Sequence, residues 1–294
     1  MEAVRTQAPA RQLFADYLSL TKPSIVGLLV ATALAAMVAA SHGRPHLLAM
    51  LAVIVGGSLA AGGAHAINCW YDGDIDLLMS RTRRRPIPDG RIPGWHALAL
   101  GVGCNVVAFT VLWAWANLFA ASLALAATLI YVFVYTIWLK RATPQNIVIG
   151  GAAGAIPPLV GWAAVTGGLD VTAISLFLVI FLWTPPHFWA LAQLIARDYR
   201  QAGIPMMPVV HSSLSTKRQS VAYAVATAAV SLVPYFTGDA GVLYLVGAVV
   251  LGVGLVGVSV LDLRGRRWTG PLFAYSIAYL AALFTVLAIA GLFA

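Results

Sequence analysis

Long apolar segments alternate with short polar connections along the whole chain. Each apolar segment is close to the about 20 residues that an α-helix needs to cross the hydrocarbon core of a bilayer. Residues 115–117 are a short break between the third and fourth segments, but the combined run is too long for one crossing. The pattern predicts an all-α polytopic membrane protein with nine transmembrane helices around a central cavity, at residues 25–40, 47–70, 96–115, 118–138, 146–165, 171–193, 220–236, 241–262 and 271–293.

The remaining composition agrees with this prediction. With 61% hydrophobic and 10% charged residues, the chain is not an ordinary soluble globule. Residues 1–20 are more polar and are predicted to be a cytosolic N-terminal tail, and residues 1–294 are expected to form one domain. Cys69 and Cys104 are too few for a disulfide framework or a thiolate metal site.

The basic residues test the number of helices, because cytosolic loops of membrane proteins are enriched in lysine and arginine. Seventeen of the 18 lie in the tail or in the loops after every second predicted helix, and only Arg44 lies on the other side. This pattern predicts a cytosolic N-terminus and an external C-terminus. The net charge of +8 then reflects topology and not nucleic-acid binding, because the charges are spread among short loops.

The end of the second predicted helix carries an unusual group of polar side chains. If the helix continues there, Asn68, Asp72 and Asp76 project from one side, because they are spaced four residues apart. Asp74 points elsewhere, and an ion pair with an arginine is the expected role for it. Amide and carboxylate oxygens suit Mg²⁺ rather than Zn²⁺, so the stripe predicts a magnesium site. The alternative is that the aspartates only pair with loop arginines.

Cations follow these acids on the same predicted side of the membrane. Arg81 and Arg85 belong to an arginine cluster directly after the stripe, and such a cluster suits an anion such as a diphosphate. Lys140 and Arg141 follow the fourth predicted helix and have two open interpretations, as phosphate ligands or as topology signals.

A second acid, Asp198, follows the sixth predicted helix. His187 lies 11 residues before it, which on a continuous helix returns to within about 20° of the same face with an axial offset of about 16 Å. A deep imidazole below a surface acid would suit a large ligand. Pro185 and Pro186 are expected to break the helix before His187, so that residue could instead satisfy freed carbonyls. His65 extends the first stripe backwards and is more commonly a packing residue.

Taken together, these residues resemble the UbiA-type intramembrane prenyltransferases, whose signature N-x-x-x-D-x-x-x-D is matched by Asn68, Asp72 and Asp76. The resemblance covers nearly the whole chain and is closest to a haem-modifying branch. The further matching segments are 21–23, 79–82, 85–86, 135–136, 139–151, 154–158, 186–188, 198–199 and 204–210. Ala202 replaces the second acid of the D-x-x-x-D motif that many members carry after Asp198.

The resemblance implies transfer of a farnesyl group from farnesyl diphosphate to a vinyl group of haem b, with addition of water. It implies that Asp198 helps the first stripe to hold Mg²⁺. The diphosphate would contact the four cations Arg81, Arg85, Lys140 and Arg141. A separate hypothesis, based on the shared face of His187 and Asp198, is that His187 holds the haem iron from below, with His65 as a second haem contact. Other proteins of haem A and oxidase biogenesis would be partners beside the lipid bilayer.

Three rival functions remain open from the sequence. A UbiA-type enzyme acting on a quinone precursor or another aromatic acceptor would be expected to carry the second paired-acid motif. A secondary transporter predicts acids near the bilayer midplane, whereas here every acid falls at a helix end or in a loop. A haem-binding electron carrier would use His65 with His187 as axial ligands, but it leaves the Asp and Arg residues unexplained.

Overall fold

The computed structural model describes residues 9–293 and confirms the predicted all-helical membrane architecture. Within these residues, nine helical segments are long and apolar enough to cross a bilayer: Pro23–Ala40, Leu47–Tyr71, Gly94–Trp115, Leu118–Ala142, Asn146–Thr166, Val171–Leu194, Ser213–Phe236, Val242–Leu263 and Arg266–Gly291. The narrow boundary between the third and fourth spans is confirmed. Asn117 caps the fourth helix by accepting a 2.8 Å hydrogen bond from the Ala120 amide.

Several spans consist of more than one helical element. The elements are α1 (Ala10–Leu20), α2 (Pro23–Ala40), α3 (Leu47–Tyr71), α4 (Gly73–Leu78), α5 (Gly94–Trp115), α6 (Leu118–Leu129), the π-helix η1 (Ile130–Leu139), α7 (Lys140–Ala142), α8 (Asn146–Ala155), α9 (Pro157–Thr166), α10 (Val171–Leu194), α11 (Ala196–Gln201), α12 (Met207–Val210), α13 (Ser213–Val230), α14 (Val233–Phe236), α15 (Val242–Leu263), the 3₁₀ turn η2 (Arg266–Trp268) and α16 (Thr269–Gly291).

Two boundaries differ from the prediction for identifiable reasons. The seventh span begins at Ser213 and not near residue 220, because Ser212 caps α13 and the buried polar side chains of its first turns have partners. Thr216 and Ser220 donate to carbonyls one turn earlier, and Lys217 donates to Asp262 on α15. The expected break at Pro185 and Pro186 is wrong, since α10 runs through both prolines to Leu194.

The segment expected to be a polar tail is partly a helix. α1 is docked on the bundle by buried Asp16, whose carboxylate accepts a 2.9 Å hydrogen bond from Arg91. Its other side exposes Leu13, Phe14 and Leu18. Residues 1–8, which include Arg5, lie outside the described residues.

Small residues allow the helices of the bundle to approach closely. Gly63 and Gly101 face each other between α3 and α5, where a Cβ on either would meet backbone of the other helix at 2.7 Å. Gly161 packs against the backbone of Ala33 in the same way and joins α9 to α2. Such contacts are typical of membrane helices, whose association depends on close van der Waals packing.

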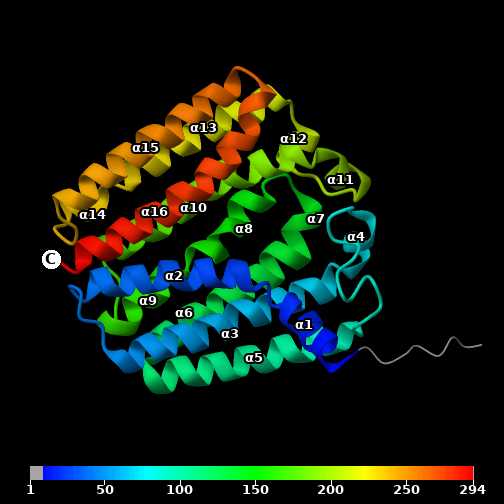
Figure 1. Ribbon diagram of the computed structural model, residues 1–294, viewed down its shortest axis with the longest axis horizontal. Helices are drawn as coiled ribbons and strands as arrows, with labels where there is room; N and C mark the ends of the chain where they lie inside the picture. Colours follow the sequence, from blue (N-terminus) through cyan, green and yellow to red (C-terminus); the bar gives the residue numbers. More distant parts are fainter. Residues whose placement is uncertain (1–8, 294) are drawn as a thin grey trace, which may run out of the picture.

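The short helices that matter for function lie at one end of the molecule. In Figure 1, α4, α7, α11 and α12 gather at the right, with α1 below them, whereas α14 and the C-terminus lie at the left. Residues that are far apart in the sequence therefore meet at the ends of α3, η1 and α10. The assignment of this end to the cytosol remains a prediction from the charge pattern.

Candidate active site

The predicted stripe lies where α3 gives way to α4. The helix does not continue unbroken, because Asp72 lies between the end of α3 at Tyr71 and the start of α4 at Gly73, but the helical spacing is kept. The Asp72 amide donates to the Asn68 carbonyl at 2.9 Å, and the Asp76 amide donates to the Asp72 carbonyl at 2.8 Å. Asn68, Asp72 and Asp76 are at most 3% exposed, whereas the Asp74 side chain is 64% exposed. The predicted difference between Asp74 and the other two aspartates is confirmed.

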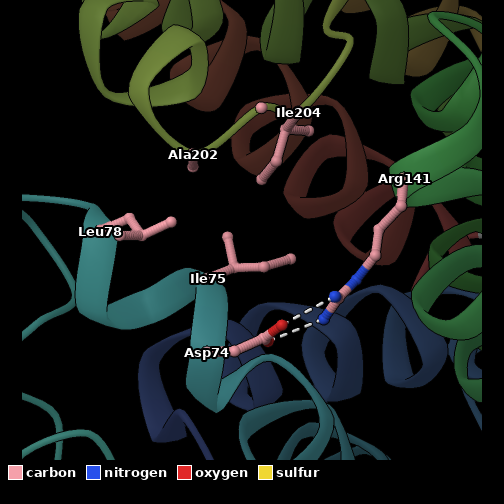
Figure 2. Close-up of a pocket in the computed structure, with 7 residues that line it drawn as sticks. Asp74, Ile75, Leu78, Arg141, Ala202 and Ile204 are labelled. Atoms are coloured by element: carbon pink, nitrogen blue, oxygen red, sulfur yellow. Dashed lines mark hydrogen bonds and ion pairs between the residues drawn. The ribbon is translucent and has the colours of Figure 1, made fainter.

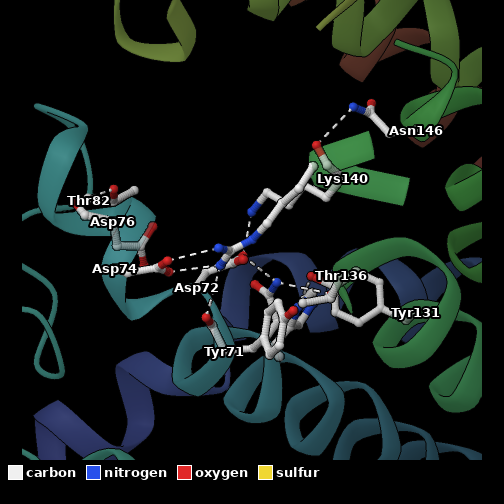
Figure 3. Close-up of polar contacts among 12 residues, drawn as sticks. Tyr71, Asp72, Asp74, Asp76, Thr82, Tyr131, Thr136, Lys140 and Asn146 are labelled. Carbon is white, nitrogen blue, oxygen red and sulfur yellow. Dashed lines mark hydrogen bonds and ion pairs between the residues drawn. The ribbon is translucent and has the colours of Figure 1, made fainter. Parts of the chain in front are cut away.

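Each member of the stripe has a cation beside it. Lys140 forms an ion pair with Asp72 Oδ2, Arg85 pairs with Asp76 Oδ2 at 2.7 Å, and Lys22 Nζ donates to Asn68 Oδ1 at 2.9 Å. The amide of Asn68 also donates to Asp72 Oδ2 at 2.6 Å. Figure 3 shows Asp72, Asp76 and Lys140 of this network near the end of α3. The stripe thus has two carboxylates and three adjoining basic side chains, which gives it an excess of positive charge.

Sequence reasoning missed Lys22 as a site residue. It lies between α1 and α2 with φ 52°, a left-handed conformation that is unfavourable for a residue with a Cβ and is found at strained functional positions. Burial, together with the nearby charges of Arg85 and Lys140, lowers the pKa of Lys22 to about 8 against the opposing effect of Asp72. The available signal was its place directly before Pro23 at the entrance of the first span.

Arg85 and Asp74, which lie outside the membrane spans, have pKa values shifted by their ion-pair partners. Burial lowers the pKa of Arg85, but the Asp76 carboxylate outweighs this and raises it overall. The hydrogen bonds from Arg141 hold the pKa of Asp74 below its usual value. Arg141 is therefore committed to Asp74, at 2.8 Å for both guanidinium nitrogens, and does not point freely into the site.

The π-helix η1 brings three residues to the same face of α3. Tyr131 hydrogen-bonds His65 at 3.2 Å, Thr136 accepts from Asn68 at 3.2 Å, and Lys140, at the start of α7, pairs with Asp72. On an α-helix, positions five residues apart lie about 140° from each other. The wider turns of a π-helix, which are common at functional sites, align them instead.

Asp198 reaches the same region from α11. Its carboxylate accepts a 2.7 Å hydrogen bond from Ser80, which follows α4, so the two acidic loops are joined. Burial raises the pKa of neighbouring Tyr199, and Tyr135 and Asp198 raise it further, whereas the charges of Arg81 and Lys140 oppose the rise. Arg81 itself is solvent-exposed.

The donor set fits a magnesium ion. Asp72 Oδ1 is buried and makes no hydrogen bond within residues 9–293, and it belongs to a set of hard amide and carboxylate oxygens. The described residues contain no group of three or more His, Cys, Asp or Glu side chains arranged to hold a metal. Mg²⁺ does not need such a cage, since it commonly uses one or two carboxylates with water and substrate phosphates.

The two histidines lie in different surroundings. His187 stacks between Trp183 and Phe273, with ring centroids 4.4 and 4.9 Å away. The Ser276 hydroxyl donates its proton to the Phe273 carbonyl. In its 2.8 Å contact with His187, the same hydroxyl oxygen therefore accepts from Nδ1–H. This leaves His187 Nε2 without a proton, as an acceptor. The expected single face with Asp198 is wrong, because α10 ends at Leu194 and Asp198 lies on α11. His65 is buried, and its Nε2 makes no hydrogen bond within the described residues.

A cavity of about 190 Å³ lies between α4, α7 and the turn after α11. Asp74, Ile75, Leu78 and Arg141 form one wall, and residues 202–204 form the other. Figure 2 shows the Asp74–Arg141 pair at its base. Polar and apolar side chains thus meet at the same opening.

Known proteins are similar to this chain in sequence or in fold. The model of the UbiA prenyltransferase family matches residues 29–278. The chain is 52% identical over 280 residues to a protoheme IX farnesyltransferase of Roseiflexus sp. (strain RS-1), covering 94% of this chain and 52% of the relative. It is 51% identical over 281 residues to a protoheme IX farnesyltransferase of Gloeobacter violaceus, covering 95% and 92%. The chain thus spans about half of the first relative and most of the second.

Two solved structures share the fold at low sequence identity. A digeranylgeranylglyceryl phosphate synthase has a TM-score of 0.80 at 16% identity, with 96% of this chain and 99% of that one covered. A UbiA homologue from Archaeoglobus fulgidus bound to DMAPP and Mg²⁺ has a TM-score of 0.66 at 16% identity, with 93% and 99% covered.

Proposed function

Because the chain belongs to the UbiA prenyltransferase family, we propose that it transfers the farnesyl group of farnesyl diphosphate to a vinyl group of haem b, with addition of water. The observation that carries this proposal is the buried Asn68, Asp72 and Asp76 stripe beside an excess of cations. The two relatives described above support the choice of haem as acceptor.

In the proposed reaction, Asn68, Asp72, Asp76 and Asp198 would hold Mg²⁺, and the ion would supply positive charge that neutralises the diphosphate leaving group. Lys140 and Arg85 contact the two carboxylates, and they can turn to the phosphate oxygens when these enter. Lys22 and Arg81 add positive charge at the same place. Such preplaced cations stabilise the charge that develops on the leaving group.

The bond changes follow from this placement. The bond between farnesyl C1 and the diphosphate oxygen breaks and leaves an allylic cation. The electron pair of the haem vinyl group forms a new carbon–carbon bond at C1, and the resulting cation takes up water and releases a proton. The surrounding apolar helices keep bulk water from the allylic cation before the vinyl group attacks.

We assign His187 as the ligand of the haem iron, because its Nε2 is left as an acceptor between two aromatic rings. His65 is the second candidate. Haem titration of the His187→Ala variant should lose the iron–imidazole absorption bands, while His65→Ala should keep them. Unchanged bands in His187→Ala would remove this assignment.

The function is tested with purified protein in detergent. Haem b, farnesyl diphosphate and Mg²⁺ should yield farnesylated, hydrated haem that mass spectrometry identifies, and EDTA should abolish it until Mg²⁺ is restored. Asp72→Asn should lose the product and Asp89→Asn, which changes an exposed loop acid, should not. Absence of product with folded protein, or full activity of Asp72→Asn, would contradict the proposal.

We also propose that this end of the molecule faces the cytosol of a bacterial inner membrane, which the loop charges support. An Arg83→Cys variant should then react with a membrane-impermeant maleimide only in inverted vesicles. Labelling in intact cells would overturn this orientation.

A further inference from the structure

Arg141 contacts residues on both sides of Asp72 in the chain, Tyr71 and Asp74. Its two terminal nitrogens each donate to an oxygen of Asp74 at 2.8 Å, and one of them also donates to the Tyr71 carbonyl at 3.3 Å. The guanidinium carbon lies 5.0 Å from the centre of the Tyr71 ring. Tyr71 ends α3 and Asp74 lies in the first turn of α4, so Arg141 spans the helix break at which Asp72 is placed.

The residue before Arg141 is the cation that contacts Asp72. Lys140 and Arg141 share the short helix α7, and the Lys140 carbonyl accepts a 3.4 Å hydrogen bond from Asn146. Both residues reach across to the α3–α4 junction from the same turn. Fixing the guanidinium therefore also fixes where the Lys140 ammonium lies.

Stability alone does not account for this pair. The side chains of Arg141 and Asp74 are 38% and 64% exposed, and exposed ion pairs usually contribute little to stability. Yet the contact between Arg141 and Asp74 is bidentate, and the ring and carbonyl of Tyr71 also contact the guanidinium, so its geometry is fixed. A diphosphate would have to displace Asp74 to use the same nitrogens.

We propose that the Arg141–Asp74 pair is a clamp that positions Lys140 on Asp72 and in the diphosphate site, and that Arg141 does not touch the diphosphate. This rests on the proposed function. Arg141 and Asp74 are then positioning residues that act through Lys140. The earlier expectation that Arg141 contacts the diphosphate is replaced by this role.

A double-mutant cycle tests the clamp through activity. Arg141→Ala and Asp74→Ala should each lower kcat/KM for farnesyl diphosphate by about tenfold to a hundredfold, because a small displacement of a contacting group has effects of this size. The double variant should be no worse than either single variant. The exchanged pair Arg141→Asp with Asp74→Arg should regain activity. Asp89→Ala, which changes an exposed acid paired with Arg91, is the matched control.

A second measurement reports on the clamp without turnover. The chain has three lysines, so amidination by methyl acetimidate can be followed at Lys140 relative to Lys217, which is buried in a separate ion pair. The ratio should rise in Arg141→Ala and Asp74→Ala and stay unchanged in Asp89→Ala. Asp74→Asn, which keeps the side-chain shape, replaces Asp74→Ala if that variant does not fold.

The outcomes separate the two proposals. If Asp74→Ala keeps wild-type activity and labelling while Arg141→Ala loses activity, Arg141 binds the substrate directly and the clamp is wrong. If no variant, including the wild type, farnesylates haem, the proposed function fails, and the labelling ratio alone decides whether the clamp positions Lys140.

Discussion

Two buried lysine–aspartate pairs in this protein have similar chemistry but different surroundings. Lys140 pairs with Asp72 at the end of α3, and Lys217 pairs with Asp262 at 3.0 Å between α13 and α15. Both aspartates are 1% exposed, and each has one oxygen that makes no hydrogen bond within residues 9–293. The pairs alone would not reveal which of them has a chemical role.

The neighbours make the difference. Lys217 also donates to the Asp262 backbone carbonyl at 2.6 Å, and Thr269 donates to Asp262 Oδ1 at 2.7 Å. One cation thus balances one anion, and the contacts join α13, α15 and α16. At the other site, cations outnumber carboxylates and lie beside an opening. A balanced pair satisfies its own charges within the fold, whereas an excess of charge of one sign prepares a site for the opposite charge.

The largest effect is expected from breaking the balanced pair. Lys217→Met leaves Asp262 as an unpaired buried charge, which should lower the free energy of unfolding by about 3–5 kcal/mol. Denaturation in mixed micelles measures this. The double variant Lys217→Met with Asp262→Leu should recover most of the loss, because replacing both charges by apolar groups is often neutral. A double variant as unstable as the single one would show that the pair has another role.

The matched substitution in the Lys140–Asp72 pair should lower catalytic activity and not stability. Lys140→Met should lower kcat/KM by about a hundredfold, because it removes a cation placed for the leaving group. Its unfolding should resemble that of the wild type much more than Lys217→Met does, since Asp72 keeps the Asn68 amide and lies near Lys22 and Arg85. Equal destabilisation by both substitutions would erase the distinction between the pairs.

The smallest effect on activity is expected from the hydrogen bond that joins the two acidic loops. Ser80→Ala removes the 2.7 Å hydrogen bond to Asp198, and a neutral donor of this kind contributes about 1 kcal/mol. Activity should fall by about fivefold. Ser122→Ala, which removes a hydroxyl bonded within its own helix, serves as the control and should leave the rate unchanged. Equal rates for both variants would show that Asp198 needs no link to Ser80.

Sequence predicted the architecture well because the bilayer imposes it. Span length and loop charge follow from local rules, and the stripe Asn68, Asp72 and Asp76 follows from helical spacing. Two features were not predicted, namely the start of the seventh span at Ser213 and the continuation of α10 through Pro185 and Pro186. Hydropathy does not report the packing on which they depend. Lys22 is 46 residues from Asn68 in the chain, so only the packed bundle brings them together.

The π-helix η1 also changes how length variation should be understood. In most lipid-facing stretches, losing or gaining one residue alters only the tilt or the depth of a span. Between Ile130 and Leu139, losing one residue would close the wide turns into ordinary ones and rotate Tyr131 against Thr136 and Lys140. The membrane would still be crossed, but the pairing with α3 would be lost. A one-residue gap in an alignment at this stretch is therefore a change of active-site chemistry, even where every side chain around it is the same.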